Sequence, residues 1–138
     1  MKILGIEHIG IAVESLAQRG PFWEHILNLP CTGVEEVNEQ GVKTAIYQAG
    51  KDKIELLESL YPESSLAKFI NRRGAGIHHI CLEVEDLQEA IQELKEAQIQ
   101  VINEVPAKGV EGHLVAFIHP RSTGGILVEL TQKTSPKH

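Results

Sequence analysis

Hydrophobic and polar residues alternate in two stretches of the chain that resemble one another. The first covers residues 5–16 and the second residues 76–87, and seven of their twelve positions are identical without a gap, at an offset of 71 residues. In a β-strand, alternation sends successive side chains to opposite faces of the sheet. Each stretch therefore predicts a strand with one apolar face and one face of small or polar residues, and the offset carries His8 onto His79.

A second repeat lies near the end of each half of the chain. Residues 53–57 resemble residues 127–131, which places Glu55 over Glu129. The residues on either side of each glutamate are apolar, so each glutamate is on the opposite face from its neighbours. We infer a duplicated module in which each half supplies one histidine and one glutamate to an inner face, while the apolar faces pack on helices.

The duplication predicts two modules, about residues 4–58 and 76–132, within a single domain of residues 1–138. The first half reads as a strand, a helix and three strands. Gly20 and Pro21 interrupt the helix. Because proline is tolerated in a first helical turn but not inside a helix, we expect a short turn and then a helix that begins near Pro21.

A linker helix is predicted between the modules, over about residues 63–74. A serine side chain can cap the free N–H groups at a helix start, and glycine is typical just after a helix end. Ser64 or Ser65 therefore begins this helix and Gly74 ends it.

The second half repeats the order of elements. Asp86, with Glu89 three residues on, has the pattern of a capping box and predicts a helix after the His79 strand. Strands are expected over residues 101–105 and 114–119 and around Glu129. Residues 120–125 are expected to form the loop that joins the last two strands.

The two histidines and two glutamates on the inner face predict a metal site. A hydrogen-bonded core histidine or a solvated glutamate explains one such residue alone. Four of them on one face are harder to explain, because burying unpaired carboxylates beside imidazoles is costly unless something pairs with them. Imidazole and carboxylate suit zinc, cobalt, manganese or nickel, and four protein ligands leave two positions open on an octahedral metal.

Composition narrows the class of protein. The net charge of −6 and the pI near 5.6 argue against a nucleic-acid surface, which would be basic and clustered. The first residues lack the apolar run of a signal peptide and no stretch has the length that spans a bilayer, so we expect no membrane partner and a cytoplasmic location. Cys31 and Cys81 have no CxxC spacing, and both are expected to be reduced.

Several segments resemble the vicinal oxygen chelate superfamily, which has the glyoxalase-like fold, and within it the methylmalonyl-CoA epimerases. The resemblance covers nearly the whole chain. It is carried by residues 6–13, 54–58, 76–80 and, most specifically, 115–130. It implies an α+β fold of two tandem βαβββ modules that form an open, cup-shaped mixed β-barrel with helices outside.

The resemblance also implies a site and a reaction. One divalent metal per chain is expected at the ligand positions, which are His8, Glu55, His79 and Glu129. The implied function is metal-dependent epimerisation of methylmalonyl-CoA at C2, by proton abstraction and return through an enolate that the metal stabilises. The implied partners are an acyl-CoA substrate and a second copy of the chain, as a homodimer.

The catalytic groups follow less directly from the resemblance. Inversion at C2 needs acid/base groups on opposite sides. Some epimerases have glutamate at the position of Thr44, and because threonine cannot be the base, Glu129 is expected to serve one face and Glu55 or a bound water the other. Some epimerases have glutamine in place of Glu55. The residues expected to bind substrate are His119, Arg121, Ser122 and Thr44.

Two other functions stay open at this point, because a fold does not settle a function. One is a glyoxalase-type lyase or isomerase that acts on a thiol adduct. The other is a non-catalytic binding protein for small molecules. Retention of all four residues of ligand type speaks against the binding protein, and the match over residues 115–130 speaks against the glyoxalase.

Overall fold

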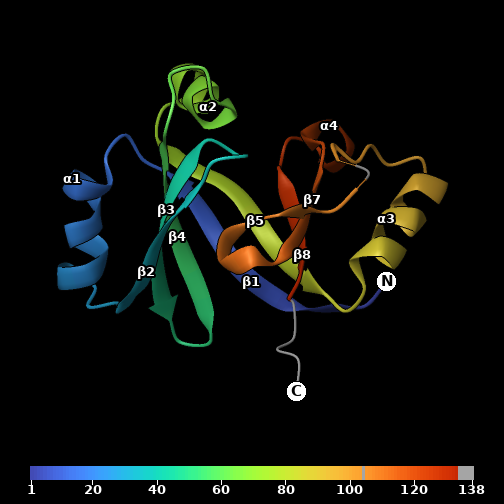
Figure 1. Cartoon of the computed structure of the whole chain (residues 1–138), viewed down its shortest axis with the longest axis horizontal. Helices are drawn as coiled ribbons and strands as arrows, with labels where there is room; N and C mark the ends of the chain where they lie inside the picture. The colour runs from blue at the N-terminus through green and yellow to red at the C-terminus, as the bar shows by residue number, and fades with distance from the viewer. Residues whose placement is uncertain (104, 134–138) are drawn as a thin grey trace. The chain divides into compact units, whose positions relative to one another are not determined.

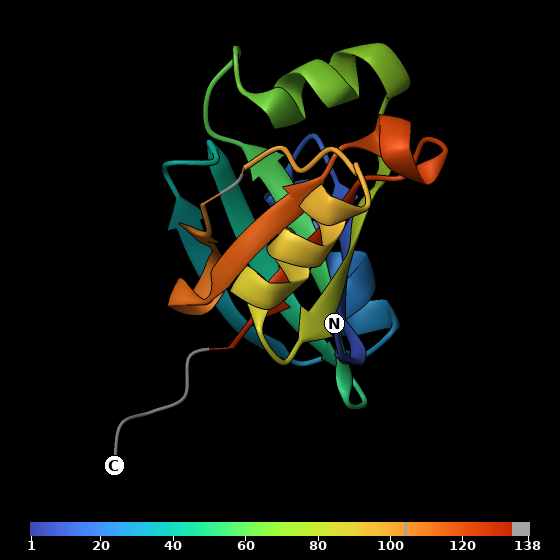
Figure 2. The same cartoon turned by 90° about the vertical axis from the view of Figure 1, so that its right-hand side faces the viewer.

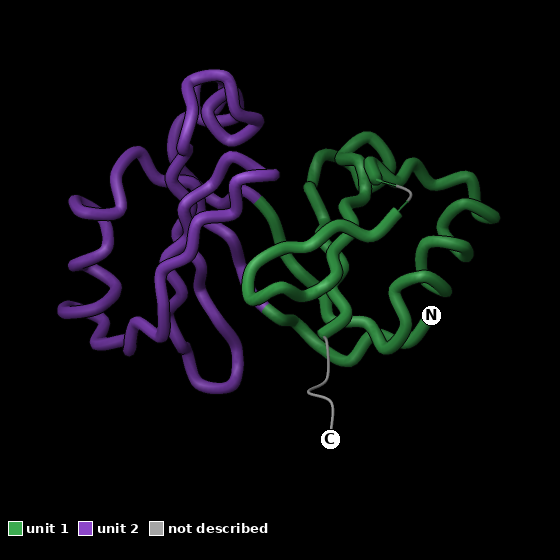
Figure 3. Tube along the Cα trace, viewed as in Figure 1, with its two compact units in different colours: residues 1–7, 79–138 green, residues 8–78 purple. Residues whose placement is uncertain are grey.

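The computed structural model describes residues 1–103 and 105–133. The chain divides into two compact units (Figure 3). Unit 1 contains residues 1–7 and 79–138, and unit 2 contains residues 8–78. The division cuts β1 (Ile3–Ala12) and β5 (Gly76–Val84), so each of these strands contributes to both units. The sequence predicted two modules, about residues 4–58 and 76–132, within a single domain. This division stays a prediction.

Unit 2 contains the elements of the first half of the chain. After β1 come α1 (Leu16–Pro21), the π-helix η1 (Phe22–Ile26), β2 (Cys31–Val37), β3 (Val42–Ala49), β4 (Asp52–Ser59) and α2 (Ser65–Arg73) (Figure 1). Ser64 caps α2 by accepting a hydrogen bond from the Ala67 N–H, and the Gly74 N–H donates to the Ile70 carbonyl at its end. Both boundaries of the predicted linker helix are confirmed.

Unit 1 contains the elements of the second half. After β5 come α3 (Leu87–Glu96), β6 (Ala107–Lys108), the 3-10 turn η2 (Val110–Gly112), β7 (Leu114–Ile118), α4 (Pro120–Thr123) and β8 (Val128–Gln132). Asp86 caps α3 as predicted, with its carboxylate 3.1 Å from the Glu89 N–H. Within the described part of the chain, the helices are too short and too polar to cross a membrane.

The strand order is the same in both units. It runs β2-β3-β4-β1 in unit 2 and β6-β7-β8-β5 in unit 1. β1 is parallel to β4 and β5 is parallel to β8, whereas the neighbours farther from β1 and β5 are antiparallel. In each half, the strand with the histidine therefore lies beside the strand with the glutamate. The mixed sheet with helices agrees with the predicted α+β class.

The apolar faces of the strands pack on helices, as predicted. In unit 1, α3 lies over β7 and β8 (Figure 2), and Leu87 and Ile91 of the helix are buried with Leu130 of β8. In unit 2, α1 approaches β3 so closely that a Cβ atom at Gly20 would lie 2.8 Å from the hydroxyl of Tyr47. A larger residue at this helical position would require the Tyr47 hydroxyl to move.

The first helix differs from the prediction at Pro21. α1 begins at Leu16, where the Ser15 side chain accepts from an N–H group, and it runs through Pro21 into the π-helix. Proline has no N–H to donate to the carbonyl four residues earlier. The chain widens instead of ending, and the Leu27 N–H donates to the Phe22 carbonyl at 2.9 Å. A helix does begin next to Pro21, because the π-helix starts at Phe22, but residues 16–21 are helical where a short turn was expected.

The strand predicted over residues 101–105 is also wrong. Val101 forms only an isolated bridge, to Ile118, and Glu104 lies outside the described residues. The Asn103 side chain takes the place of a strand backbone, because its amide donates to the Val115 carbonyl at 3.1 Å and accepts from the Phe117 N–H at 2.9 Å. The short strand β6 follows instead.

Candidate metal centre

The first predicted ligand pair forms within unit 2. In the parallel pairing of β1 with β4, Gly10 is opposite Glu55, and His8 is two residues before Gly10 on the same face. Gly10 has no side chain to fill the space between them. His8 Nδ1 lies 3.2 Å from Glu55 Oε2, and the two residues are 5% and 2% exposed. Strand register therefore joins two residues that are far apart in sequence.

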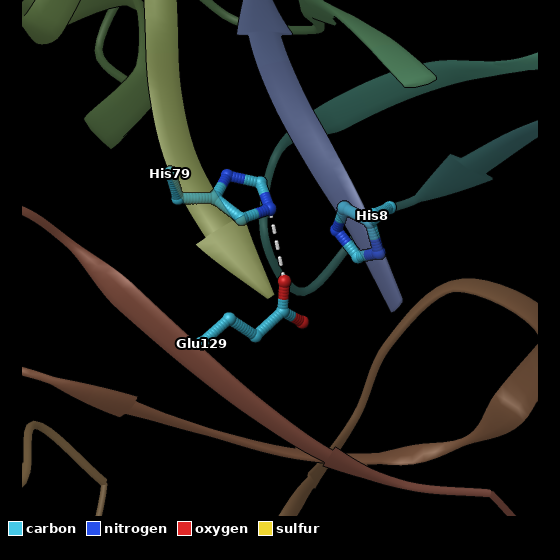
Figure 4. Close-up of side chains that lie close together, drawn as sticks. All are labelled: His8, His79 and Glu129. Carbon is cyan, nitrogen blue, oxygen red and sulfur yellow. Dashed lines mark ion pairs between the residues drawn. The ribbon is translucent and has the colours of Figure 1, made fainter. Parts of the chain in front are cut away.

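The second pair forms within unit 1 by the same construction. In the parallel pairing of β5 with β8, Cys81 is opposite Glu129, and His79 is two residues before Cys81. His79 Nε2 lies 2.9 Å from Glu129 Oε1, and both residues are buried (Figure 4, which also labels His8). The Phe117 ring meets the His79 ring edge to face, with centroids 6.3 Å apart. The structure thus repeats the pair that the sequence repeat predicted.

The residues present fit a divalent metal by their chemistry. Imidazole nitrogen and carboxylate oxygen are ligands that zinc, cobalt, manganese and nickel accept. A buried carboxylate beside an imidazole is costly to leave without a compensating charge, and a cation between such groups supplies it. The groups of buried side chains with metal-ligand atoms, among the described residues, are His8, His79 and Glu129, and Glu7, His8 and Glu55.

The chain is similar to known proteins in sequence and in structure. The sequence model of the Glyoxalase/Bleomycin resistance protein/Dioxygenase superfamily matches residues 7–117. The chain belongs to this superfamily. The match confirms the predicted fold class. In this member of the superfamily, each half of the repeat contributes one His–Glu pair.

The relatives of this superfamily member include enzymes and a protein without a described activity. The chain is 40% identical to the uncharacterized protein YqjC of Bacillus subtilis (strain 168), over 96% of this chain and 95% of that protein. It is 36% identical to the mitochondrial methylmalonyl-CoA epimerase of Homo sapiens, over 92% of this chain and 73% of that protein.

A solved methylmalonyl-CoA epimerase, in complex with methylmalonyl-CoA and NH4+, superposes with a TM-score of 0.93 at 26% identity, over 97% of both chains. Together with the human relative, it confirms the predicted enzyme class, an isomerase of the epimerase type.

Glu7 is a buried carboxylate that the sequence reading did not select. It is 9% exposed, and its Oε2 lies 2.9 Å from Lys133 Nζ. Glu83 is a second, more distant partner of the same ammonium, at 3.8 Å. The hydrogen bond that the Lys133 ammonium donates to Glu7 is the main cause that raises the pKa of Lys133. In the repeat, Glu7 coincides with His78, a mismatch that gave no reason to select it.

Thr44 has a buried hydroxyl without a partner. The residue is 1% exposed, and its Oγ1 is the buried side-chain atom that makes no hydrogen bond within the described residues. Leaving a buried hydroxyl unpaired costs about 1–3 kcal/mol. Thr44 is opposite Leu57 on β4, two residues from Glu55, so it lies on the same face of the sheet as the His8–Glu55 pair. A bound molecule with an acceptor atom would satisfy it.

The other three residues predicted to bind substrate lie at the start of α4, in the segment expected to be a loop. His119 caps this one-turn helix, with Nδ1 accepting from the Arg121 N–H at 3.0 Å. The Ser122 hydroxyl accepts from the Gln100 N–H at 3.1 Å. Residues 120–125 lie between the last two strands as expected, but the first four of them form the one-turn helix α4. Their role in binding substrate stays a prediction.

Proposed function

We propose that the protein inverts C2 of methylmalonyl-CoA by removing a proton from one face and returning one to the other. The observation that carries this proposal is the duplicated pair of buried His–Glu contacts, at 3.2 Å and 2.9 Å. A buried imidazole beside a buried carboxylate is suited to holding a cation, and a cation next to a thioester makes its α-proton acidic. The named activity of the relatives agrees with this chemistry.

One divalent metal is proposed to bind His8, Glu55, His79 and Glu129 together. Each unit supplies one imidazole and one carboxylate, and two ligands are fewer than the four to six that these metals take. When bound, the metal supplies Lewis-acid stabilisation of the negative charge that develops on the thioester oxygen. Cobalt, zinc, manganese and nickel all suit these donor atoms.

Glu129 is proposed to be one of the two groups that handle the proton. Its carboxylate is buried, and the short contact with His79 holds it in one orientation. Burial strips water from the carboxylate, which makes it a better acceptor for a carbon-bound proton than a solvated glutamate. Glu55 has a similar setting beside His8, and it is the alternative proton carrier as well as a ligand.

Recognition of the substrate is proposed to involve Thr44 and the α4 segment. The Thr44 hydroxyl can donate to an oxygen of the acyl group, because it makes no hydrogen bond within the described chain. His119, Arg121 and Ser122 lie together at α4, where the Arg121 guanidinium can pair with an anionic group of the CoA portion. We also propose that the protein acts as a homodimer and that it is located in the cytoplasm.

Exchange at C2 tests the proposed function. One epimer of methylmalonyl-CoA is incubated with the metal-loaded protein in heavy water, with deuterium at C2 followed by NMR and inversion by chiral separation. We expect both exchange and inversion. Absence of both, at full metal content, would remove the epimerase function. Turnover of methylglyoxal with a thiol instead would establish the glyoxalase alternative, and metal binding without either reaction would favour a binding protein.

A further inference from the structure

Glu35 shares one face of the unit 2 strands with Thr44 and Glu55. β2 and β3 are antiparallel, and Glu35 is directly opposite Thr44. β3 and β4 are also antiparallel, and Thr44 is directly opposite Leu57, two residues beyond Glu55. Residues directly opposite one another project from the same face, as do residues two apart on one strand. The register therefore places a third carboxylate on the face that carries the His8–Glu55 pair.

The burial of β2 supports this orientation. Beyond the irregular pairing at Cys31–Gly33, half-buried and exposed positions alternate from Gly33 to Val37. Glu35 is half-buried, whereas Glu36 is exposed and Val34 is 54% exposed. A glutamate that serves only solubility belongs on the exposed side, where Glu36 lies. Glu35 is on the covered side, and its carboxylate belongs to the face that carries Thr44.

The Thr44 hydroxyl indicates that a bound molecule covers this face. It is buried, and no hydrogen bond within the described residues satisfies it, so a bound molecule is the natural partner. Directly opposite Cβ atoms in an antiparallel pair are about 4.5–5.5 Å apart, and diagonal ones about 7–8 Å apart. A small acyl group over Thr44 therefore lies within reach of both Glu35 on one side and Glu55 on the other.

We propose that Glu35 is the acid/base group for the face of C2 that Glu129 does not serve, and that Thr44 donates a hydrogen bond to an oxygen of the bound acyl group. This inference rests on the proposed function. It answers the question that threonine at position 44 raises, because threonine cannot take a proton from carbon. A carboxylate directly opposite, on the neighbouring strand, reaches the same region of the face.

The proton transfers balance between two carboxyl groups. With one epimer, the C2–H bond breaks, the proton passes to a Glu35 oxygen, and the electron pair moves into the C1–C2 bond and onto the thioester oxygen. Glu129, which begins protonated, then gives its proton to the opposite face of C2, and the electrons return from the oxygen. The two carboxyl groups finish with their protonation states exchanged. Turnover of the other epimer, or exchange with water, restores them.

Glu35→Gln tests the assignment, with Glu36→Gln as the matched control from the exposed side of the same strand. Each pure epimer is incubated separately in heavy water with each variant, and the metal content of every protein sample is measured. In Glu35→Gln we expect inversion to fall by roughly a hundredfold or more, the effect of removing a positioned acid/base group. Exchange without inversion should persist for the one epimer whose C2 proton faces Glu129. Glu36→Gln should match wild type in both measurements.

A rescue experiment separates catalysis from folding. Adding Thr44→Glu to Glu35→Gln places a carboxylate on the same face, directly opposite the lost one. The double variant should invert C2 at least tenfold faster than Glu35→Gln alone. Thr44→Val alone should raise KM more than Thr44→Ser, which keeps the hydroxyl. Inversion by Glu35→Gln within about threefold of wild type would overturn the inference. So would loss of exchange for both epimers in metal-loaded Glu35→Gln without rescue by the double variant. Absence of exchange in wild type refutes the proposed function instead.

Discussion

Replacement of Glu129 by glutamine is the most direct test of how the buried pairs work. Glu129 Oε1 lies 2.9 Å from His79 Nε2, and the residue is 6% exposed. Glutamine has almost the same shape and keeps an oxygen that can bind a metal, but it has no basicity near neutral pH. The packing around β8 should therefore survive, and so should much of the metal content.

The expected loss is in rate. Removing a positioned general base costs typically a factor of 100 to 10,000, and the lower figure corresponds to about 2.7 kcal/mol in the activation free energy. We therefore expect Glu129→Gln to retain most of its metal and to lose roughly a hundredfold or more in deuterium exchange at C2. Glu55→Gln should be milder, because the family resemblance of the sequence implies that glutamine is tolerated at this position.

The assay measures deuterium at C2 and metal content on the same samples. Glu85→Gln is the control, because this glutamate lies in unit 1 with a side chain that is 64% exposed, and it should behave as wild type. Near-normal exchange by metal-loaded Glu129→Gln would remove Glu129 from the path of the proton. Loss of metal from Glu129→Gln would show instead that the charge, and not only the oxygen, is needed to hold the cation.

Three further predictions concern the metal and the buried charges. His8→Ala and His79→Ala should each empty the single metal site, whereas His25→Ala, at an exposed residue, should keep the metal. Full metal occupancy in the His8 or the His79 variant, measured by elemental analysis, would contradict a shared site. Metal content and activity should both fall toward about pH 5, since free imidazole has a pKa of about 6.5; occupancy that is flat with pH excludes histidine ligands. Lys133→Met should lower the free energy of unfolding by about 1 kcal/mol in urea at pH 7, because it removes the ammonium that lies 2.9 Å from the buried Glu7 carboxylate. The pKa of Lys133 is raised from 10.5, so its contribution is complete below that pH and is lost as the pH rises through the raised value; an equal deficit at pH 7 and at higher pH refutes this.

Local patterns in the sequence were sufficient for much of the fold and for the identity of the paired residues. Alternation around His8 and His79 assigned the strands and their faces, because a strand repeats every two residues. The caps at Ser64 and Asp86 were also predictable, since a cap involves only the first turn of its own helix.

Where a local rule competes with its surroundings, only the structure decided. The rule that proline is disfavoured inside a helix predicted a turn before Pro21, but residues 16–21 are already helical and a π-helix follows from Phe22. The apolar alternation near Val101 predicted a strand, but the Asn103 side chain bonds to β7 in place of a backbone. A side chain that substitutes for the backbone leaves no mark on hydrophobic periodicity.

The contacts within the site could be identified only from the tertiary structure. The sequence repeat predicted one histidine and one glutamate for each half, but the parallel pairing that sets Glu55 beside His8 is a matter of register between distant strands. The same holds for Glu7 with Lys133 and for Glu35 opposite Thr44. Periodicity determines which face a side chain takes. Which side chains meet on that face depends on how the strands align, and that is decided by the packing of the whole unit.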